Sequence, residues 1–176
     1  MKKLKKFKDI KIVFMDVDGV LTRGEAIFID GASPKIWYVR DRLAVKLLSS
    51  LPEEDIKIIW VSGRPCAELA ERGAELGVDE IFSNIDDKVK VMEEVLLKYN
   101  FSNEDALYIG DDLMDIKCIK RVSVGCCPAD AAGEVKDEAD YICENPGGRG
   151  AVREIIENIL KSKGHWAGIV ERFKGD

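Results

Sequence analysis

Two aspartates lie one residue apart directly after the first apolar run of the chain. Asp16 and Asp18 stand in the motif DVDGV, which follows the apolar residues 12–15. In a straight strand, side chains two residues apart lie on the same side, and Gly19 would let the chain leave the sheet sharply. Paired carboxylates of this kind can do nucleophilic or acid–base chemistry. Alone, however, the pair would also suit a helix cap and a turn.

Further polar residues follow later apolar runs and strengthen the functional interpretation. They are Ser62, Gly63, Arg64, Lys88, Asp111, Asp112 and Asp115. In open α/β sheets, sites form where the carboxyl ends of the strands meet. If these ends meet, five aspartates crowd together, and two carboxylates about 4 Å apart repel by about 4 kcal/mol at an effective dielectric of about 20. A hard cation would relieve this repulsion, and oxygen ligands without His or Cys favour Mg²⁺.

The apolar runs themselves predict the fold class. Short apolar strands that alternate with helices are typical of a parallel sheet covered on both faces. We therefore predict an α/β protein with a Rossmann-like parallel sheet and helices on both faces. Gly77 and Asn100 stand where two of the helices should end. The expected strands are 12–15, 56–61, 80–82, 106–109 and 122–124, and the expected helices are 43–50, 66–76, 88–99, 113–119 and 151–160.

One segment does not fit this alternation. Residues 26–29 and 36–39 are apolar and flank a turn-rich loop, which predicts a protruding β-hairpin over about residues 25–39. Trp37 and Tyr38 would lie on opposite faces of their strand. A hairpin that is apolar on both sides needs a cover, and we expect a partner subunit to provide it.

Composition narrows the class of protein. The 176 residues contain 27 Lys and Arg against 33 Asp and Glu, a net charge of −6, which argues against nucleic acid as a partner. No signal peptide or membrane-spanning run is found, so we expect no membrane partner. Five cysteines without metal-type spacing favour a reducing compartment, and we expect a cytoplasmic protein. We divide the chain into a basic arm (1–9), a single domain (10–163) and a tail (164–176).

The order of these motifs resembles that of the haloacid dehalogenase superfamily of phosphohydrolases. The DxD motif, the Ser after the second strand, the Lys and the acidic GDDxxxD-like motif occur here in the same order. The resemblance implies that Asp16 is a nucleophile which forms an aspartyl-phosphate. It also implies that Asp18 is the general acid and base, which protonates the leaving alcohol and then activates water.

The same resemblance implies which residues bind phosphate and metal. Ser62, Gly63 and Lys88 would hold the phosphoryl oxygens, because that transition state needs positioning and charge neutralisation. Mg²⁺ would be held by Asp16, the backbone carbonyl of Asp18, and Asp111, and Asp112 and Asp115 would support these ligands from behind.

Spacing identifies a narrower group within the superfamily. Neither interval that can hold a cap domain, 20–61 or 65–87, has room for one, so we expect no cap. The pattern over about residues 10–166 resembles the capless, tetrameric 3-deoxy-D-manno-octulosonate 8-phosphate phosphatase family. Its more specific marker is the run GGRGAVRE at 147–154. The resemblance implies a small phosphorylated sugar acid as substrate, either that octulosonate phosphate or a related nonulosonate phosphate, and a homotetramer assembled through the hairpins.

Three arginines could contact such a substrate. Arg64 follows the second strand, where it could equally hold its own loop. Arg149 stands in the glycine-rich run before a helix, and helix N-termini attract anions. Arg42 lies in the segment DRLAVK, where the family usually has DGxGIK; it adds charge where substrate is expected across the subunit interface, or it is simply a solvated helix residue. The tail around His165 could close over a neighbouring site.

Three alternative functions differ in the chemistry that the acidic cluster would perform. A noncatalytic assembly or regulatory module of the same fold is one alternative, but the complete set of motif residues argues against it. A phosphatase for another phosphorylated metabolite is a second. A phospho-accepting receiver domain also uses clustered acids, a Ser or Thr and a Lys, but it lacks a DxD motif.

Overall fold

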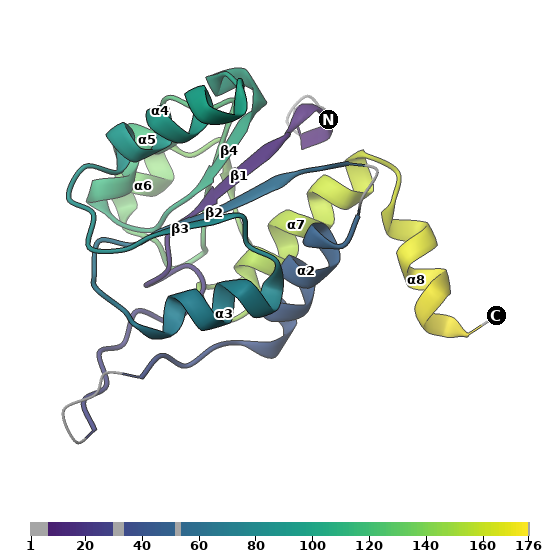
Figure 1. The fold of residues 1–176 in the computed structure, drawn as a ribbon, viewed down its shortest axis with the longest axis horizontal. Helices are drawn as coiled ribbons and strands as arrows, with labels where there is room; N and C mark the ends of the chain where they lie inside the picture. The colour runs from purple at the N-terminus through teal and green to yellow at the C-terminus, as the bar shows by residue number, and fades with distance from the viewer. Residues whose placement is uncertain (1–6, 30–33, 52–53, 176) are drawn as a thin grey trace.

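A six-stranded parallel sheet forms the centre of the molecule in the computed structural model, which describes residues 7–29, 34–51 and 54–175 (Figure 1). The strand order is β3-β2-β1-β4-β5-β6. The strands are β1 (Ile12–Met15), β2 (Lys57–Val61), β3 (Glu80–Phe82), β4 (Ala106–Ile109), β5 (Val124–Cys127) and β6 (Tyr141–Ile142). Met15 at the end of β1 pairs with Trp60 on one side and Ile109 on the other. The carboxyl ends of β1, β2 and β4 therefore lie side by side.

Helices cover both faces of this sheet, as predicted (Figure 1). One face carries α4 (Lys88–Tyr99), α5 (Ile116–Ile119) and α6 (Gly133–Glu138), and the other carries α2 (Val39–Ser49), α3 (Glu68–Leu76) and α7 (Ala151–Ser162). The helix α8 (Trp166–Lys174) follows α7, and three short 3-10 helices are η1 (Phe7–Asp9), η2 (Asn103–Asp105) and η3 (Leu113–Asp115). In the described part of the chain, no helix combines the length and apolar character needed to cross a membrane.

The strands separate two hydrophobic clusters because their side chains alternate between faces. In β1, Val13 and Met15 belong to the cluster under α2, α3 and α7, whereas Ile12 and Phe14 belong to the cluster under α4, α5 and α6. All four side chains are fully buried. Phe7 of η1 also lies in the first cluster, so the end of the predicted basic arm packs on the core.

Most predicted elements are present, although α2 begins four residues earlier than the predicted helix 43–50, and the helix predicted at 113–119 is divided into η3 and α5. Strands 12–15, 80–82 and 106–109 and the helix 88–99 have the predicted limits, and Gly77 and Asn100 are the left-handed C-caps of α3 and α4. The strand predicted at 122–124 is β5, two to three residues later, because its buried part is the run VGCC. The short β6 and α6, and α8 in the predicted tail, were not predicted.

The hairpin predicted over residues 25–39 is not formed by the described residues of this segment. Residues 23–28 and 34–38 have no strand, Ile29 makes only an isolated bridge, and Val39 already begins α2; residues 30–33 of the loop lie outside the described residues. A two-stranded hairpin is marginal by itself, and Phe28 and Ile36 are 78% and 62% exposed. The segment nevertheless protrudes from the sheet, as predicted (Figure 1).

Asp41 joins two helices that are far apart in the sequence. It lies in the first turn of α2 and is 1% exposed. Its Oδ2 accepts a hydrogen bond from the amide of Gly150 at 3.0 Å, and its Oδ1 accepts one from the amide of Arg153 at 2.7 Å. These amides belong to the N-terminus of α7, whose first N–H groups have no partner within the helix. Asp41 is therefore the cap of α7, supplied by α2.

We expect Asp41→Ala to lower the free energy of unfolding by about 1–3 kcal/mol, because two buried amides lose their acceptor. Urea denaturation at pH 7.5 would measure the change. Asp137→Ala on the exposed surface of α6 is the matched control and should leave the midpoint unchanged. An Asp41→Ala protein as stable as the control would contradict the capping role.

Candidate active site

The carboxyl ends of the central strands surround one pocket of about 420 Å³. The loops after β1, β2 and β4 contribute most of its wall. The lining residues are Asp16, Asp18, Gly24, Ser62, Gly63, Arg64, Asp111, Asp112 and Met114. The structure thus brings together the DxD motif, the Ser-Gly-Arg segment and the acidic motif, as the sequence predicted.

Close backbone contacts hold the loop after β1 in place. Gly19 has a φ of +86°, and a Cβ there would lie 1.9 Å from an oxygen of Asp111, so this turn requires glycine. From the other side, the glycine-rich run before α7 packs on the loop. A Cβ on Gly147 would lie 1.7 Å from the carbonyl oxygen of Gly19, and the amide of Gly148 donates to the carbonyl of Val20 at 2.9 Å. The run at 147–150 therefore braces the pocket.

Lys88 connects the DxD motif with the acidic motif. It is the first residue of α4, where Asp87 caps the helix, and it is 2% exposed. Its Nζ lies 2.8 Å from Asp16 Oδ2 and 2.8 Å from Asp115 Oδ1. Burial lowers the pKa of Lys88, but the charges of Asp16 and Asp115 outweigh this effect and raise it. The group is therefore a buried ammonium between two carboxylates.

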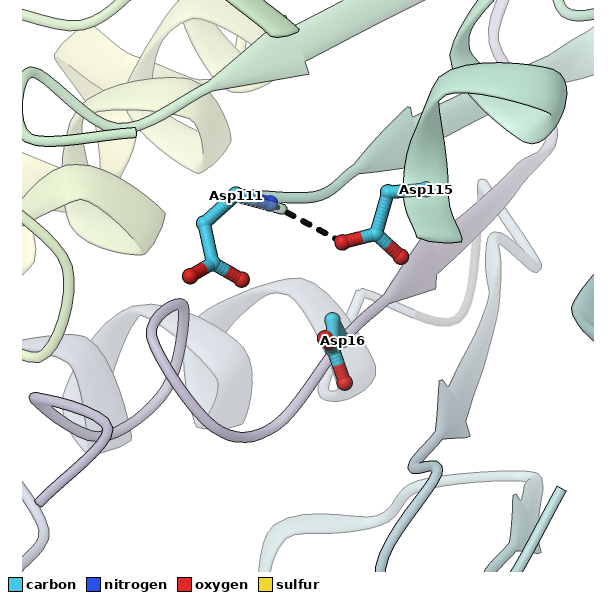
Figure 2. Close-up of side chains that lie close together, drawn as sticks. All are labelled: Asp16, Asp111 and Asp115. Carbon is cyan, nitrogen blue, oxygen red and sulfur yellow. Dashed lines mark hydrogen bonds between the residues drawn. The ribbon is translucent and has the colours of Figure 1, made fainter. Parts of the chain in front are cut away.

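Asp115 uses both of its oxygens for hydrogen bonds within the protein. Besides Lys88, Oδ1 accepts from the hydroxyl of Tyr108 at 2.8 Å, and Oδ2 accepts from the amides of Asp111 and Asp112 at 3.0 and 3.3 Å. Figure 2 shows the bond between Asp115 and the Asp111 amide. Asp115 is fully buried, so it orients the loop and Lys88 and has little capacity left to bind a ligand.

Two other carboxylates have oxygens that no group satisfies. Among the described residues, Asp111 Oδ1 and Asp18 Oδ2 are buried and lack any hydrogen-bond partner. Oxygens of Asp16, Asp111 and Asp115 lie within 4.8 Å of one another (Figure 2). Because buried acceptors without partners are costly, and because only oxygen ligands are offered, this arrangement fits a hard divalent cation. Asp16 and Asp111 are the carboxylates with capacity to hold it.

The same crowding changes the pKa values of these acids. Burial, followed by the charges of Asp16, Asp115 and Asp112, raises the pKa of Asp111 to about 8. Burial and the charge of Asp115 raise the pKa of Asp16 to about 6, against the lowering effect of Lys88. The raised pKa of Asp111 favours its protonated form in the absence of a cation, whereas a bound metal ion would favour the carboxylate.

Of the remaining predicted site residues, some line the pocket and others lie outside it. Ser62 is 1% exposed; its Oγ donates to the Arg64 carbonyl at 3.1 Å and accepts from the Arg64 amide at 3.2 Å. Arg64 itself lines the pocket. Two predicted arginines do not line it in this chain: Arg42 pairs with Glu75 of α3, and the guanidinium of Arg149 lies 5.8 Å from the ring centre of Tyr38. Each of these side chains therefore has a partner within the chain and outside the pocket.

Sequence reasoning missed Lys35, which reaches the site from the protruding segment. Its Nζ donates to Asp18 Oδ1 at 2.5 Å, and its side chain is only 9% exposed. Lys35 stood inside the predicted hairpin, away from every strand end. No signal in the sequence separates it from the other lysines of the chain, because its role depends on how the segment folds back.

Comparison with known proteins agrees with this fold and site. A family model for haloacid dehalogenase-like hydrolases matches residues 77–156. The chain is 34% identical to the 3-deoxy-D-manno-octulosonate 8-phosphate phosphatase of Haemophilus influenzae over 160 residues. These residues make up 90% of this chain and 87% of the relative. The enzyme of the same name from Escherichia coli K12 is 31% identical over 161 residues, covering 90% and 84%.

Solved structures agree as well. The 3-deoxy-D-manno-octulosonate 8-phosphate phosphatase of Moraxella catarrhalis, in complex with magnesium, phosphate and 3-deoxy-D-manno-octulosonate, superposes with a TM-score of 0.93 at 32% identity, covering 98% of both chains. The cobalt-bound phosphatase of H. influenzae gives a TM-score of 0.86 at 32% identity, covering 92% and 94%.

Fold, pocket and family match together define a phosphomonoester hydrolase of the haloacid dehalogenase superfamily. Within the described residues the sheet and its helices carry no cap domain. The acidic cluster fits a divalent cation, and the M. catarrhalis relative binds magnesium. The chain belongs to the 3-deoxy-D-manno-octulosonate 8-phosphate phosphatase family.

We expect Asp111→Asn to stabilise the metal-free protein. The pKa of Asp111 is raised on folding, so its ionisation costs stability progressively as pH rises from about 4 to about 8. The variant should gain about 1–3 kcal/mol at pH 8, after allowance for water in the open pocket, and much less at pH 5. Urea denaturation in chelator at both pH values would measure this difference.

Added Mg²⁺ should make the wild-type chain more stable than Asp111→Asn, because only the wild-type chain keeps the full set of metal ligands. Asp137→Asn, an exposed carboxylate on α6, is the matched control and should follow the wild type at each pH. If Asp111→Asn is less stable than wild type in chelator at pH 8, the cluster does not carry the repulsion described above.

Proposed function

We propose that the chain hydrolyses the phosphate ester of a small sugar acid through an aspartyl-phosphate on Asp16. The substrate is 3-deoxy-D-manno-octulosonate 8-phosphate or a related nonulosonate phosphate. The observation that carries the mechanism is the buried set of acids around Lys88, in which Asp18 Oδ2 and Asp111 Oδ1 lack partners. The relatives, at 31–34% identity over 90% of the chain, support the choice of substrate.

Asp16 and Asp18 divide the first step between them. An oxygen of Asp16 forms a bond to phosphorus while the ester P–O bond breaks and its electron pair stays on the sugar oxygen. Asp18 gives its proton to that oxygen, so the sugar acid leaves as a neutral alcohol. Lys88, 2.8 Å from Asp16 Oδ2, keeps the attacking carboxylate ionised and oriented.

The second step returns the enzyme to its starting state. Asp18, now a carboxylate, takes a proton from a water molecule as the water oxygen attacks phosphorus. The bond between phosphorus and Asp16 breaks, which releases inorganic phosphate and restores the Asp16 carboxylate. Both steps need one acid whose protonation alternates, and Asp18 lines the same pocket as Asp16.

Residues in and below the pocket wall would position the phosphoryl group. Ser62, Gly63 and Lys88 would contact its oxygens, since the first two line the pocket and Lys88 supplies positive charge from beneath. Mg²⁺ would be held by Asp16, the backbone carbonyl of Asp18, and Asp111, with Asp112 and Asp115 behind them. When bound, the ion neutralises the charge that carboxylates and phosphate bring together.

The sugar acid needs contacts that one chain does not offer. Of the three predicted arginines, Arg64 alone lines the pocket, and with no cap the pocket stays open above it. A homotetramer formed through the protruding segment 25–39 would add a neighbour's surface, where Arg42 and Arg149 could reach substrate. The exposed Phe28, Ile29 and Ile36 on this segment support an assembly role. The proposed location is cytoplasmic, in keeping with five cysteines that form no disulfide.

Replacing Asp16 by Asn should reduce phosphate release by more than about 1,000-fold, because the nucleophile is lost. Phosphate release with Mg²⁺ would be measured on a panel of phosphorylated sugars and sugar acids, with Asp137→Asn as a fully active control. During turnover by the wild type, hydroxylamine should trap a hydroxamate on the peptide that contains Asp16. Residual turnover by Asp16→Asn, or a trap on another residue, would refute the assignment.

The panel also tests the substrate. We expect a marked preference for one deoxy-sugar acid phosphate over neutral sugar phosphates. Equal weak activity on every compound would instead favour another phosphorylated metabolite as the natural substrate.

Light scattering should show a tetramer for the wild-type chain. Phe28→Lys combined with Ile36→Lys should yield smaller species and a lower kcat/KM for the sugar acid phosphate, because charge on the segment opposes its burial between subunits. Leu97→Lys, a change at an 83% exposed leucine on α4, is the matched control and should remain tetrameric. A wild-type monomer at micromolar concentration would rule out the shared site.

A further inference from the structure

Met114 differs in chemistry from the other side chains of the pocket. Of the pocket-lining residues within the described part of the chain, Met114 alone carries an apolar side chain; the others are aspartates, glycines, a serine and an arginine. A thioether donates no hydrogen bond and is a poor ligand for Mg²⁺. Met114 therefore has no part in the chemistry at phosphorus, and its place in the pocket needs another explanation.

The backbone that carries Met114 is held on both sides. Asp112 caps η3, and its Oδ1 accepts a hydrogen bond from the amide of Leu113 at 2.7 Å. On the other side, Asp115 is fully buried and accepts a hydrogen bond from Lys88 at 2.8 Å. The Met114 side chain, which is 49% exposed, therefore lines the pocket from a fixed base.

Met114 reaches from the loop after β4 to the loop after β2. A Cβ placed on Gly63 would lie 3.2 Å from the Met114 methyl carbon Cε and 3.6 Å from its sulfur. The thioether end therefore lies directly against the Gly63 backbone. In the proposed function Ser62 and Gly63 contact the phosphoryl oxygens, so the Met114 methyl group lies beside the place of the phosphoryl group.

The ester carbon, which is bonded to the bridging oxygen, is the part of the substrate that follows the phosphoryl group. In a primary ester this carbon bears one further carbon, whereas in a secondary ester it bears two and is wider at this point. An apolar side chain attracts C–H groups through dispersion and burial of apolar area. A contact that is overfilled by even one carbon is costly.

We propose that Met114 is a specificity-determining residue: its thioether packs on the ester carbon and selects primary over secondary phosphate esters. The proposal rests on the proposed function, which places the phosphoryl group against Ser62 and Gly63. It narrows the substrate class to phosphates carried by a terminal CH₂ group, a condition that C8 of an eight-carbon sugar acid meets. The groups that bind the phosphoryl oxygens cannot make this selection, because the phosphoryl group is the same in both kinds of ester.

Two isomeric substrates test the selection directly. Glycerol 3-phosphate is a primary ester and glycerol 2-phosphate is a secondary one, with the same composition and charge, so the ratio of their kcat/KM values isolates the branching. We expect the wild type to favour glycerol 3-phosphate, and Met114→Ala to lower this preference by about 10-fold, because the wall beside the ester carbon is removed. Met114→Leu has a similar volume and should keep most of the preference.

Leu113→Ala is the matched control. Leu113 is the neighbouring apolar residue of η3, is 58% exposed and does not line the pocket, so its removal should leave the isomer ratio at the wild-type value. With 3-deoxy-D-manno-octulosonate 8-phosphate, Met114→Ala should raise KM by a few-fold and change kcat little, because the same contact is lost in the ground state and in the transition state. Calorimetric titration with Mg²⁺ should show equal affinity in both variants and the wild type.

Several results would overturn the proposal. An unchanged isomer ratio in Met114→Ala would refute it, and so would the same shift in Leu113→Ala. An equal loss on every substrate, or weaker Mg²⁺ binding, would show that Met114 only supports the loop after β4. If the wild type turns over neither isomer measurably, the ratio of their inhibition constants against octulosonate phosphate hydrolysis takes the place of the kinetic ratio, with the same expected shift.

Failure of the proposed function would look different. Wild-type protein that neither hydrolyses nor binds any phosphate ester would refute the proposed function, and this proposal with it. An active wild type whose isomer ratio does not respond to Met114→Ala would refute the role of Met114 alone.

Discussion

The buried ammonium of Lys88 between Asp16 and Asp115 is the interaction on which the rest of the site depends. The loops after β1 and β4 bring five aspartates to the same edge of the sheet, and this concentration of charge opposes folding unless cations offset it. Lys88 offsets part of it at 2.8 Å from each of two carboxylates. The remainder is visible in the raised pKa of Asp111, about 8, whose main causes are burial and the neighbouring aspartates. This chain therefore supplies one cation of its own, and the partnerless oxygens of its acidic cluster fit a second, divalent one.

The acidic side chains can come so close together because the loops that carry them pack tightly against neighbouring backbone. The loop after β1 can approach Asp111 only because Gly19 has no side chain, and the turn before α7 can brace that loop only because Gly147 has none. Asp41 then ties the start of α7 to α2 by two hydrogen bonds. The resemblance drew attention to 41–46 and 147–154 as substrate-facing segments, yet much of what they do in this chain is to hold the pocket wall together.

Local patterns in the sequence predicted the elements and the motif positions but not the contacts between distant segments. The strand at 12–15, the helix at 88–99 and the convergence of Asp16, Asp18 and Asp111 follow from periodicity and from the geometry of parallel sheets. Lys35 and the helix cap at Asp41 could not be predicted, because each acts on a residue far away through a path that only the fold defines. The described residues of segment 25–39 do not form the predicted hairpin for the opposite reason: the local pattern is strong, but a lone two-stranded ribbon lacks the packing that would keep its strands paired.

The protruding segment contains two kinds of side chain, which differ in their surroundings. Its apolar side chains, such as Phe28 and Ile36, are exposed in the single chain. At its returning end, two partly buried side chains contact the rest of the subunit: Trp37 stacks on Trp60 and Lys35 pairs with Asp18. Ile36 lies between Lys35 and Trp37 and faces solvent, whereas both of its neighbours pack against the same subunit. One short stretch therefore carries an exposed apolar side chain next to two side chains that tie it to the sheet and to the loop after β1.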